Sequence, residues 1–335
     1  MFAAKKTKTY DFLINAGLKY KSVFLELCQK IICEEKIPQS TLNTTLYMIW
    51  KKSGAQNLLS NQRFIHLKNV LARSLDSLIT NYMKPCILKN TSIFQIGGIP
   101  GHSMEEFILV FKTVLARAEE EGNGMIFTSM DIKSFFDKED IYDCLETLEN
   151  IGVDKKARRL WFLINNNTKI KVRTACGDSK GVNVGPVIGQ GTAGAGLISA
   201  LNLDMGLNHQ FKGSDDLYKY GNIEIQPLAY QDDVGSITKS LNETRSQASK
   251  FVKLLKIKNL EAHPIKTGIT ILGKRKFITK TENEMVNNPI DFCKFKVNLK
   301  SNEKYLGQIF EKNNNKSAYS TASMRAKKLK LPFSN

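Results

Sequence analysis

The stretch PLAYQDDVGSI, residues 227–237, places two carboxylates side by side between apolar residues. This pattern predicts two β-strands joined by a tight turn that carries Asp232 and Asp233. Neighbouring like charges repel, and two explanations are open. Turns favour aspartate because its side chain bonds the local backbone. Alternatively, a divalent cation turns the repulsion into joint ligation. The second explanation requires a further acid close by in the fold.

Asp131 is the candidate for that further acid. It lies near the end of the stretch GMIFTSMDI, residues 124–132, which predicts a buried strand. A charge after such a run is costly unless it is paired or binds metal. If the strands before Asp131 and Asp232 lie side by side, three carboxylates converge. That is a ligand set for two magnesium ions about 3.5–4 Å apart, which catalyse phosphoryl transfer.

The rest of the chain shows alternating helical and strand patterns, which predict an α+β or α/β core. Ser103 and Glu106 form a capping box before an apolar-periodic run. The periodicity predicts a helix that begins after Gly101 and includes residues 107–122. It predicts further helices over residues 10–36, 41–50, 66–83, 138–152, about 154–165, the second part of 189–207, and about 241–257. It predicts further strands over residues 168–174, 267–273 and 304–310, the last as one arm of a hairpin.

The charge balance favours a polyanionic partner. The 335 residues include 49 Lys and Arg against 32 Asp and Glu, for a formal net charge of +17. Nucleic acid is the first candidate and an anionic membrane surface the second. The alternative is a basic soluble protein without such a partner. The length suits two or three subdomains.

Other features narrow the class of protein. None of the six cysteines forms a C-x-x-C pair, so we expect reduced thiols in an intracellular protein without structural zinc. No apolar run reaches 18 residues, and the N-terminus lacks the apolar core of a signal peptide. The stretch GITILGKR, residues 268–275, nearly fits a phosphate loop, but Arg275 replaces the required hydroxyl and the apolar middle indicates a strand.

Several motifs together resemble the consecutive blocks of reverse transcriptases, most closely those of non-LTR (LINE-type) retrotransposons. Their order and approximate spacing match over residues 48–311. The motifs are WKKSGAQNLLSNQRFIHL, QIGGIPGHSMEEFI, MDIKSFFD, GQGTAGAG, AYQDDV, HPIKTG and KYLG. The resemblance implies an α+β right-hand polymerase, whose palm is an antiparallel sheet backed by helices. It also implies an RNA-directed DNA polymerase that extends a primer 3′-hydroxyl with dNTPs on an RNA template.

The resemblance also implies a division of the chain. We expect an N-terminal helical extension (1–47), fingers (48–122), a palm (123–310, with some fingers elements between about 140 and 188) and the start of a truncated thumb (311–335). The partners would be an RNA template, a DNA primer and dNTPs, with no membrane. An intracellular location is expected, and the resemblance points to the nucleus. The oligomeric state is left open.

The resemblance assigns roles to the acids and to one lysine. Asp131 and Asp232 would bridge two Mg²⁺ ions, or Mn²⁺ as an alternative, and Asp233 would assist. The backbone carbonyl of Ile132 would be a further ligand. Lys266 matches the lysine that protonates the leaving pyrophosphate, which is a general-acid role.

Nucleotide and primer contacts follow in the same way. Lys52 and Arg63 would grip the triphosphate, where a cationic clamp makes chemical sense. Gln190 and Gly191 would lie against the template and the nascent base pair. Phe136 stands where reverse transcriptases place an aromatic ring that excludes a ribose 2′-hydroxyl. A primer grip would comprise Tyr305, Leu306 and Gly307.

Some positions depart from the family pattern, and two alternatives stay open. Gln231 stands where alanine is commonest, Phe64 replaces a usual proline, and His263 replaces a usual asparagine; GTAGAG replaces GDPLSP. One alternative is an element-derived remnant that binds nucleic acid without polymerising. The other is an RNA-dependent RNA polymerase. It is disfavoured because such enzymes carry an aspartate at the position of Phe136, whereas Asp137 lies one residue later.

Overall fold

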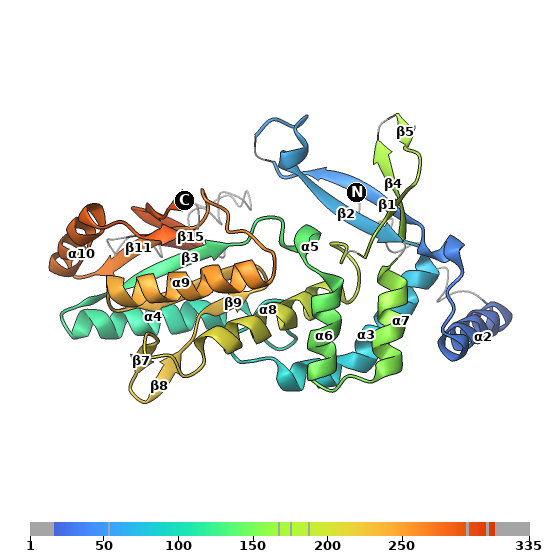
Figure 1. Cartoon of the computed structure of the whole chain (residues 1–335), viewed down its shortest axis with the longest axis horizontal. Helices are drawn as coiled ribbons and strands as arrows, with labels where there is room; N and C mark the ends of the chain where they lie inside the picture. The colour runs from blue at the N-terminus through green and yellow to red at the C-terminus, as the bar shows by residue number, and fades with distance from the viewer. Residues whose placement is uncertain are drawn as a thin grey trace, which may run out of the picture. The chain divides into compact units, whose positions relative to one another are not determined.

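The computed structural model describes residues 17–311, except residues 53, 167, 175, 187, 293, 294, 306 and 307. The chain forms two compact units, each assembled from two separate segments (Figure 1). Unit 1 comprises residues 1–90 and 136–199, and unit 2 comprises residues 91–135 and 200–335. The chain passes from one unit to the other at three points, and two of these lie within helices α5 (Phe135–Lys138) and α8 (Ala195–Phe211).

Unit 1 is built on a five-stranded sheet. Its order is β2-β1-β4-β5, and β6 also pairs with β4. β1 runs antiparallel to β2 but parallel to β4. The strands are β1 (Thr44–Trp50), β2 (Gln62–Lys68), β4 (Thr168–Thr174), β5 (Gly177–Asp178) and β6 (Val182–Val184). The prediction of a helix over 41–50 is therefore wrong, because the β-branched and aromatic residues of TTLYMIW fit a pleated sheet.

The helices of unit 1 begin at polar caps. The predicted helix over 66–83 begins later, because β2 continues to Lys68 and the Asn69 side chain accepts a hydrogen bond from the Leu71 N–H. Asp140 and Asp154 cap α6 and α7 in the same way. The helical elements are α2 (Leu18–Glu34), η1 (Gln39–Leu42), η2 (Leu59–Asn61), α3 (Val70–Asn90), α6 (Ile141–Asn150) and α7 (Lys155–Asn165).

Unit 2 is built on a second five-stranded sheet, in the order β14-β11-β3-β10-β9. The pairs are antiparallel except β11 with β14. The strands are β3 (Gly124–Asp131), β9 (Leu228–Tyr230), β10 (Asp233–Thr238), β11 (Gly268–Gly273) and β14 (Asn298–Leu299). The stretch GITILG forms the buried strand β11, as predicted, and is not a phosphate loop.

Helices α4 (Met104–Glu120) and α9 (Leu241–Ile257) pack against this sheet, and α10 (Arg275–Asn287) packs against β11 (Figure 1). The predicted capping box at Ser103 and Glu106 is present at the start of α4. Phe107 and Phe111 of α4 contact Phe127 of β3 through edge-on ring packing. All three side chains are fully buried, so this aromatic cluster anchors β3 in the core.

Three small hairpins complete unit 2. They pair β7 (Tyr218–Tyr220) with β8 (Ile223–Ile225), β12 (Asp291–Phe292) with β13 (Phe295–Lys296), and β15 (Asn302–Tyr305) with β16 (Gln308–Glu311). The stretch 304–310 was predicted as one arm of a hairpin, but it contains parts of both arms, because Tyr305 pairs with Gln308. Among the helices described, none combines the length and apolar character that crossing a membrane requires.

Candidate active site

Asp131 and Asp233 lie opposite each other in neighbouring strands. Asp131 ends β3, Asp233 begins β10, and the two residues are register partners in an antiparallel pair. Directly opposed residues project to the same side of a sheet, with Cβ atoms about 5 Å apart. Asp232 precedes Asp233 in the turn that follows β9. The predicted neighbouring strands are therefore present, and acids distant in sequence meet at one end of the sheet.

The carboxylates of Asp131, Asp232 and Asp233 repel one another electrostatically. Burial and, to a smaller extent, the negative charges of Asp232 and Asp131 together raise the pKa of Asp233 to about 6. The Lys266 ammonium opposes this rise. Because the repulsion is felt by a half-buried group, a cation placed among these oxygens would be stabilised.

Lys266 forms an ion pair with Asp131. Its Nζ lies 2.8 Å from Oδ2 of Asp131, whose side chain is 15% exposed. The loop before β11 is fixed to the end of β3 through the backbone, because the His263 N–H donates to the Asp131 carbonyl at 2.8 Å. The Lys300 Nζ donates to the Lys266 carbonyl at 2.6 Å. Sequence reasoning missed Lys300, which lies outside the recognisable motifs.

The metal-binding capacity of the site follows from its donors. Across the part of the chain that the structure describes, no three acidic, histidine or cysteine side chains are already arranged to hold a metal ion. Carboxylate oxygens are nevertheless the donors that Mg²⁺ prefers. The mutual repulsion that raises the pKa of Asp233 is relieved by a divalent cation. Asp131, Asp232 and Asp233 therefore fit such ions. Ile132 is buried and forms a backbone bridge with Ala262.

Lys52 and Arg63 lie at the same end of the β1–β2 hairpin. Arg63 is opposite Ile49 near the start of β2, and Lys52 follows β1 with a left-handed backbone, φ 58°. Both residues are exposed. The preceding Lys51 holds the hairpin closed, because its N–H donates to the Asn61 carbonyl at 2.9 Å. The hairpin end thus presents several cations to solvent.

The loop before α8 carries Gln190 and Gly191 and is fixed to β2. The His66 N–H donates to the Gln190 carbonyl at 3.0 Å. Gly191 has φ 101°, a conformation that side chains rarely adopt. Oδ2 of the fully buried Asp76 accepts from the Ala193 N–H at 3.0 Å. Sequence reasoning missed Asp76, although an acid on the apolar face of α3 is a detectable signal.

The remaining predicted residues are Phe136 and the residues of the primer grip. Phe136 is half-buried in α5. Burial raises the pKa of the neighbouring Asp137, and the nearby Lys51 opposes this. Tyr305 ends β15, whereas Leu306 and Gly307 lie outside the described residues. The three acids and Lys266 belong to unit 2. Unit 1 contains the residues predicted to contact the nucleotide, which are Lys52, Arg63, Phe136, Gln190 and Gly191.

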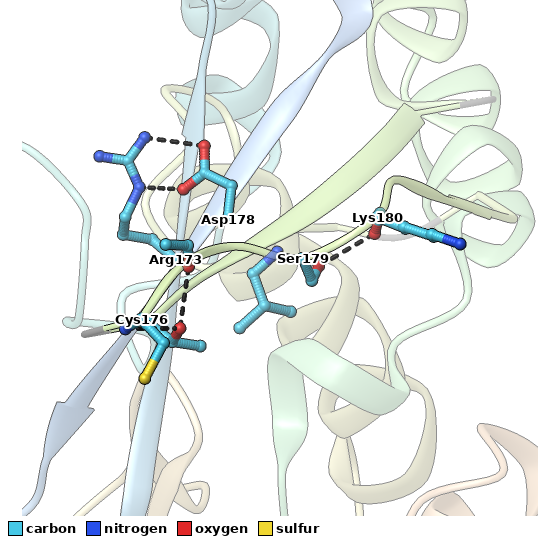
Figure 2. Close-up of polar contacts among 8 residues, drawn as sticks. Arg173, Cys176, Asp178, Ser179 and Lys180 are labelled. Atoms are coloured by element: carbon cyan, nitrogen blue, oxygen red, sulfur yellow. Dashed lines mark hydrogen bonds and ion pairs between the residues drawn. The ribbon is translucent and has the colours of Figure 1, made fainter.

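A row of cations follows one face of β4. Lys169, Lys171 and Arg173 alternate along the strand and are exposed. Arg173 pairs with Asp178 of β5 through both Nε and Nη2, as Figure 2 shows. The salt bridge neutralises Arg173 but not the two lysines, so this basic row keeps net positive charge suited to a phosphate backbone.

Comparison with solved structures identifies the fold. Apo telomerase from Candida tropicalis gives a TM-score of 0.54 at 12% identity, over 87% of this chain and 52% of that chain. Telomerase from Candida albicans, in complex with the TWJ fragment of telomeric RNA, gives 0.53 at 11% identity, over 85% and 48%. The chain thus spans about half the length of these proteins. The likeness shows the fold, a right-hand polymerase, and confirms the predicted fold class.

Comparison of the sequence identifies the family. No curated protein matches the sequence. The model of the family described as reverse transcriptase (RNA-dependent DNA polymerase) matches residues 49–310, which includes the acids of β3 and β10, the loop before α8 and Lys266. The chain therefore belongs to the reverse transcriptase family, whose members are nucleotidyltransferases.

Proposed function

We propose that the chain is an RNA-directed DNA polymerase that extends a primer 3′-hydroxyl with dNTPs. The observation that supports this most strongly is the pairing of Asp131 with Asp233, beside Asp232, within the region matched by the reverse transcriptase family. Two antiparallel strands, one ending at Asp131 and the other beginning at Asp233, supply the carboxylates that phosphoryl transfer requires. The family match gives the reaction class to which such a site belongs.

Asp131 and Asp232 would hold two Mg²⁺ ions, or Mn²⁺, with help from Asp233 and the backbone carbonyl of Ile132. When bound, such ions activate the attacking hydroxyl and stabilise the leaving oxygen. The protein contributes the positions of the carboxylates and their partial burial. The ion pair of Lys266 with Asp131 places an ammonium beside the acids, where it can donate a proton to the leaving pyrophosphate.

Unit 1 would bind the nucleotide and the template. Lys52 and Arg63 would contact the triphosphate from the exposed end of the β1–β2 hairpin. Gln190 and Gly191 would lie against the nascent base pair, and Phe136 would select deoxyribose by excluding the 2′-hydroxyl. In this assignment residues 48–122 would form the fingers and residues 123–310 the palm, with some fingers elements between about 140 and 188.

The partners would be an RNA template, a DNA primer and dNTPs. The net charge of +17 supports polyanion binding. Tyr305, Leu306 and Gly307 would grip the primer strand. The resemblance of the motifs to LINE-type retrotransposons supports an origin in such an element and action in the nucleus, with a thumb beginning near residue 311.

A substitution of one acid tests this proposal. Asp232→Asn keeps the size of the side chain but removes its charge. We expect it to lose nearly all dNTP incorporation on an RNA template, while its affinity for primer–template duplex stays within about twofold, because the basic surfaces remain. The matched control is Asp215→Asn, a change of an exposed acid in the same unit. Substantial residual extension by Asp232→Asn would overturn the two-metal assignment. A wild-type protein that binds duplex without extending it would indicate a nucleic-acid-binding protein instead.

A further inference from the structure

The segment before α4 lies along β9 and reaches the turn that carries the acids. Gln95 forms a parallel bridge with Ala229 of β9. The Ile96 N–H donates to the Ala229 carbonyl, and the Ala229 N–H donates to the Phe94 carbonyl, each at 2.8 Å. These bonds extend the sheet of unit 2 by one short segment. They bring Gln95 beside residue Gln231, which immediately precedes Asp232.

The side chain of Gln95 is fully buried and bonded at both ends. Its Nε2 donates to the Ala200 carbonyl at 3.3 Å. Its Oε1 accepts from two backbone N–H groups, those of Gly97 and Gln231, each at 3.1 Å. A buried amide with these partners is held in one orientation, because losing any of them would leave a polar group unsatisfied.

The backbone of Gln231 adopts an unfavourable conformation. Its φ is 57°, in the left-handed region that is unfavourable for a residue with a side chain. The bond from its N–H to Gln95 is one interaction that holds this conformation. The direction in which the chain leaves Gln231 sets where Asp232 and Asp233 lie.

Gly97 lies in close contact with the backbone of Tyr230 and Gln231, so the segment before α4 packs against the turn that carries the acids. A Cβ atom at Gly97 would lie 2.3 Å from the Gln231 nitrogen and 2.4 Å from the Tyr230 carbonyl carbon. Those contacts are with backbone atoms, which cannot rotate away. Gly97 therefore permits a contact that any other residue would break, and this contact places the Gln95 amide within bonding distance of Gln231.

We propose that Gln95 is a positioning residue for the acids of β10. Its side-chain oxygen holds Gln231 in the left-handed conformation, and this conformation directs Asp232 and Asp233 toward Asp131. Gln95 makes no contact with the reacting groups in this scheme and acts through the backbone of Gln231. The inference extends the proposed polymerase function, on which the kinetic part of its test depends.

The test uses Gln95→Met, which keeps the volume and removes both hydrogen-bonding groups. The matched control is Gln247→Met. Gln247 is also a buried glutamine of unit 2, is 2% exposed, and donates to the Asp216 carbonyl at 2.7 Å from α9. The first readout, amide hydrogen exchange followed by mass spectrometry, needs no activity. We expect faster exchange in peptides that cover residues 227–237 for Gln95→Met, and wild-type exchange there for Gln247→Met.

The second readout is primer extension. We expect Gln95→Met to lower kcat by about 10- to 100-fold, the range expected when reacting groups are misplaced by about an ångström. It should also raise the Mg²⁺ concentration that gives half the maximal rate, whereas the primer–template Kd should stay within about twofold. A second substitution, Gln231→Gly, should recover part of the lost rate, because glycine adopts the left-handed conformation without support.

The outcomes separate the two proposals. Unchanged exchange over 227–237 in Gln95→Met, or no recovery by Gln231→Gly, would overturn the role of Gln95. An inactive wild-type protein whose exchange responds as expected would overturn the polymerase assignment and leave this role intact. If Gln95→Met fails to fold, Gln95→Leu serves instead, because it also removes both hydrogen-bonding groups. Faster exchange over 227–237 would support the role, and exchange at the wild-type rate would contradict it.

Discussion

The Nζ atom of Lys266 lies 2.8 Å from Oδ2 of Asp131, so the loop before β11 and the end of β3 are joined by an ion pair. The lysine is 61% exposed and the aspartate 15% exposed. An exposed lysine contributes little to stability through such a pair, about 1 kcal/mol at most. Its position beside the acids therefore matters more for chemistry than for folding.

Lys266→Ala should slow nucleotide addition with little loss of stability. Removing a general acid typically costs about 10²- to 10⁴-fold in rate. We expect a decrease in this range in single-turnover extension, while the free energy of unfolding in urea changes by less than about 1 kcal/mol. Lys253→Ala, which removes another exposed lysine of unit 2, is the control. An unchanged rate would show that Lys266 only balances the charge of Asp131.

Phe136→Ala should relax the choice of sugar. The half-buried ring is proposed to exclude a 2′-hydroxyl, so a methyl group would leave room for it. We expect the ratio of kcat/KM for dCTP to that for CTP to fall by at least about tenfold, which corresponds to about 1.4 kcal/mol of discrimination. Phe135→Leu alters the neighbouring ring, which is buried in the core, and controls for a general loosening of α5. An unchanged ratio would exclude Phe136 as the selecting residue.

Charge reversal on β4 should weaken nucleic-acid binding in a salt-dependent way. Lys169 and Lys171 are exposed, whereas Arg173 is already paired with Asp178 (Figure 2). The double change Lys169→Glu and Lys171→Glu should therefore lower the affinity for RNA strongly and reduce the slope of log K against log salt by about 1 to 2. Arg173→Gln should have a smaller effect. Equal effects of the two variants would contradict the role assigned to the Arg173–Asp178 pair.

His66 should make stability depend on pH between about 4 and 6.5. Burial lowers its pKa to about 4, and the positive charge of Lys68 contributes. The folded protein keeps the ring neutral over this range, whereas the unfolded chain takes up a proton, so stability present above pH 6.5 is lost as the pH falls toward 4. The loss should reach roughly 3 kcal/mol.

Urea unfolding at pH 7 and pH 4.5 measures this effect. His66→Gln keeps a polar side chain without a proton equilibrium, so we expect a smaller fall in its unfolding free energy than in that of the wild type. The other acids are common to both proteins and cancel in the comparison. Equal falls in the two proteins would show that His66 is protonated in the folded state.

The sequence predicted the sheet of unit 2 well because its strands are buried and bounded by clear signals. The strand that ends at Asp131 and the helix over 241–257 agree with β3 and α9, and the turn at Asp232 is present. The meeting of the acids followed from one assumption, that their strands are neighbours, and the register of Asp131 with Asp233 confirms it.

Unit 1 was harder to predict because its sheet depends on distant pairing. Residues 41–50 have no strict alternation, and the parallel partner of β1 lies beyond the whole of β3 in the sequence. Periodicity within a short window cannot detect such a partner. The supporting residues Gln95, Asp76 and Lys300 were missed for a related reason. Their roles depend on backbone groups far along the chain, as in the bond from Gln231 to Gln95.

The parallel pairing of β1 with β4 has a consequence for biosynthesis. β1 can pair on this edge only after the ribosome has synthesised β4, because Thr44 is the register partner of Ile170. At about 5–20 residues per second, the ribosome needs roughly ten seconds to deliver that partner. Meanwhile the nascent chain displays an unpaired strand edge that includes Leu46 and Tyr47, and such edges promote aggregation. We therefore expect yield in a cell-free translation system to rise when holdase chaperones are supplied during translation rather than after it.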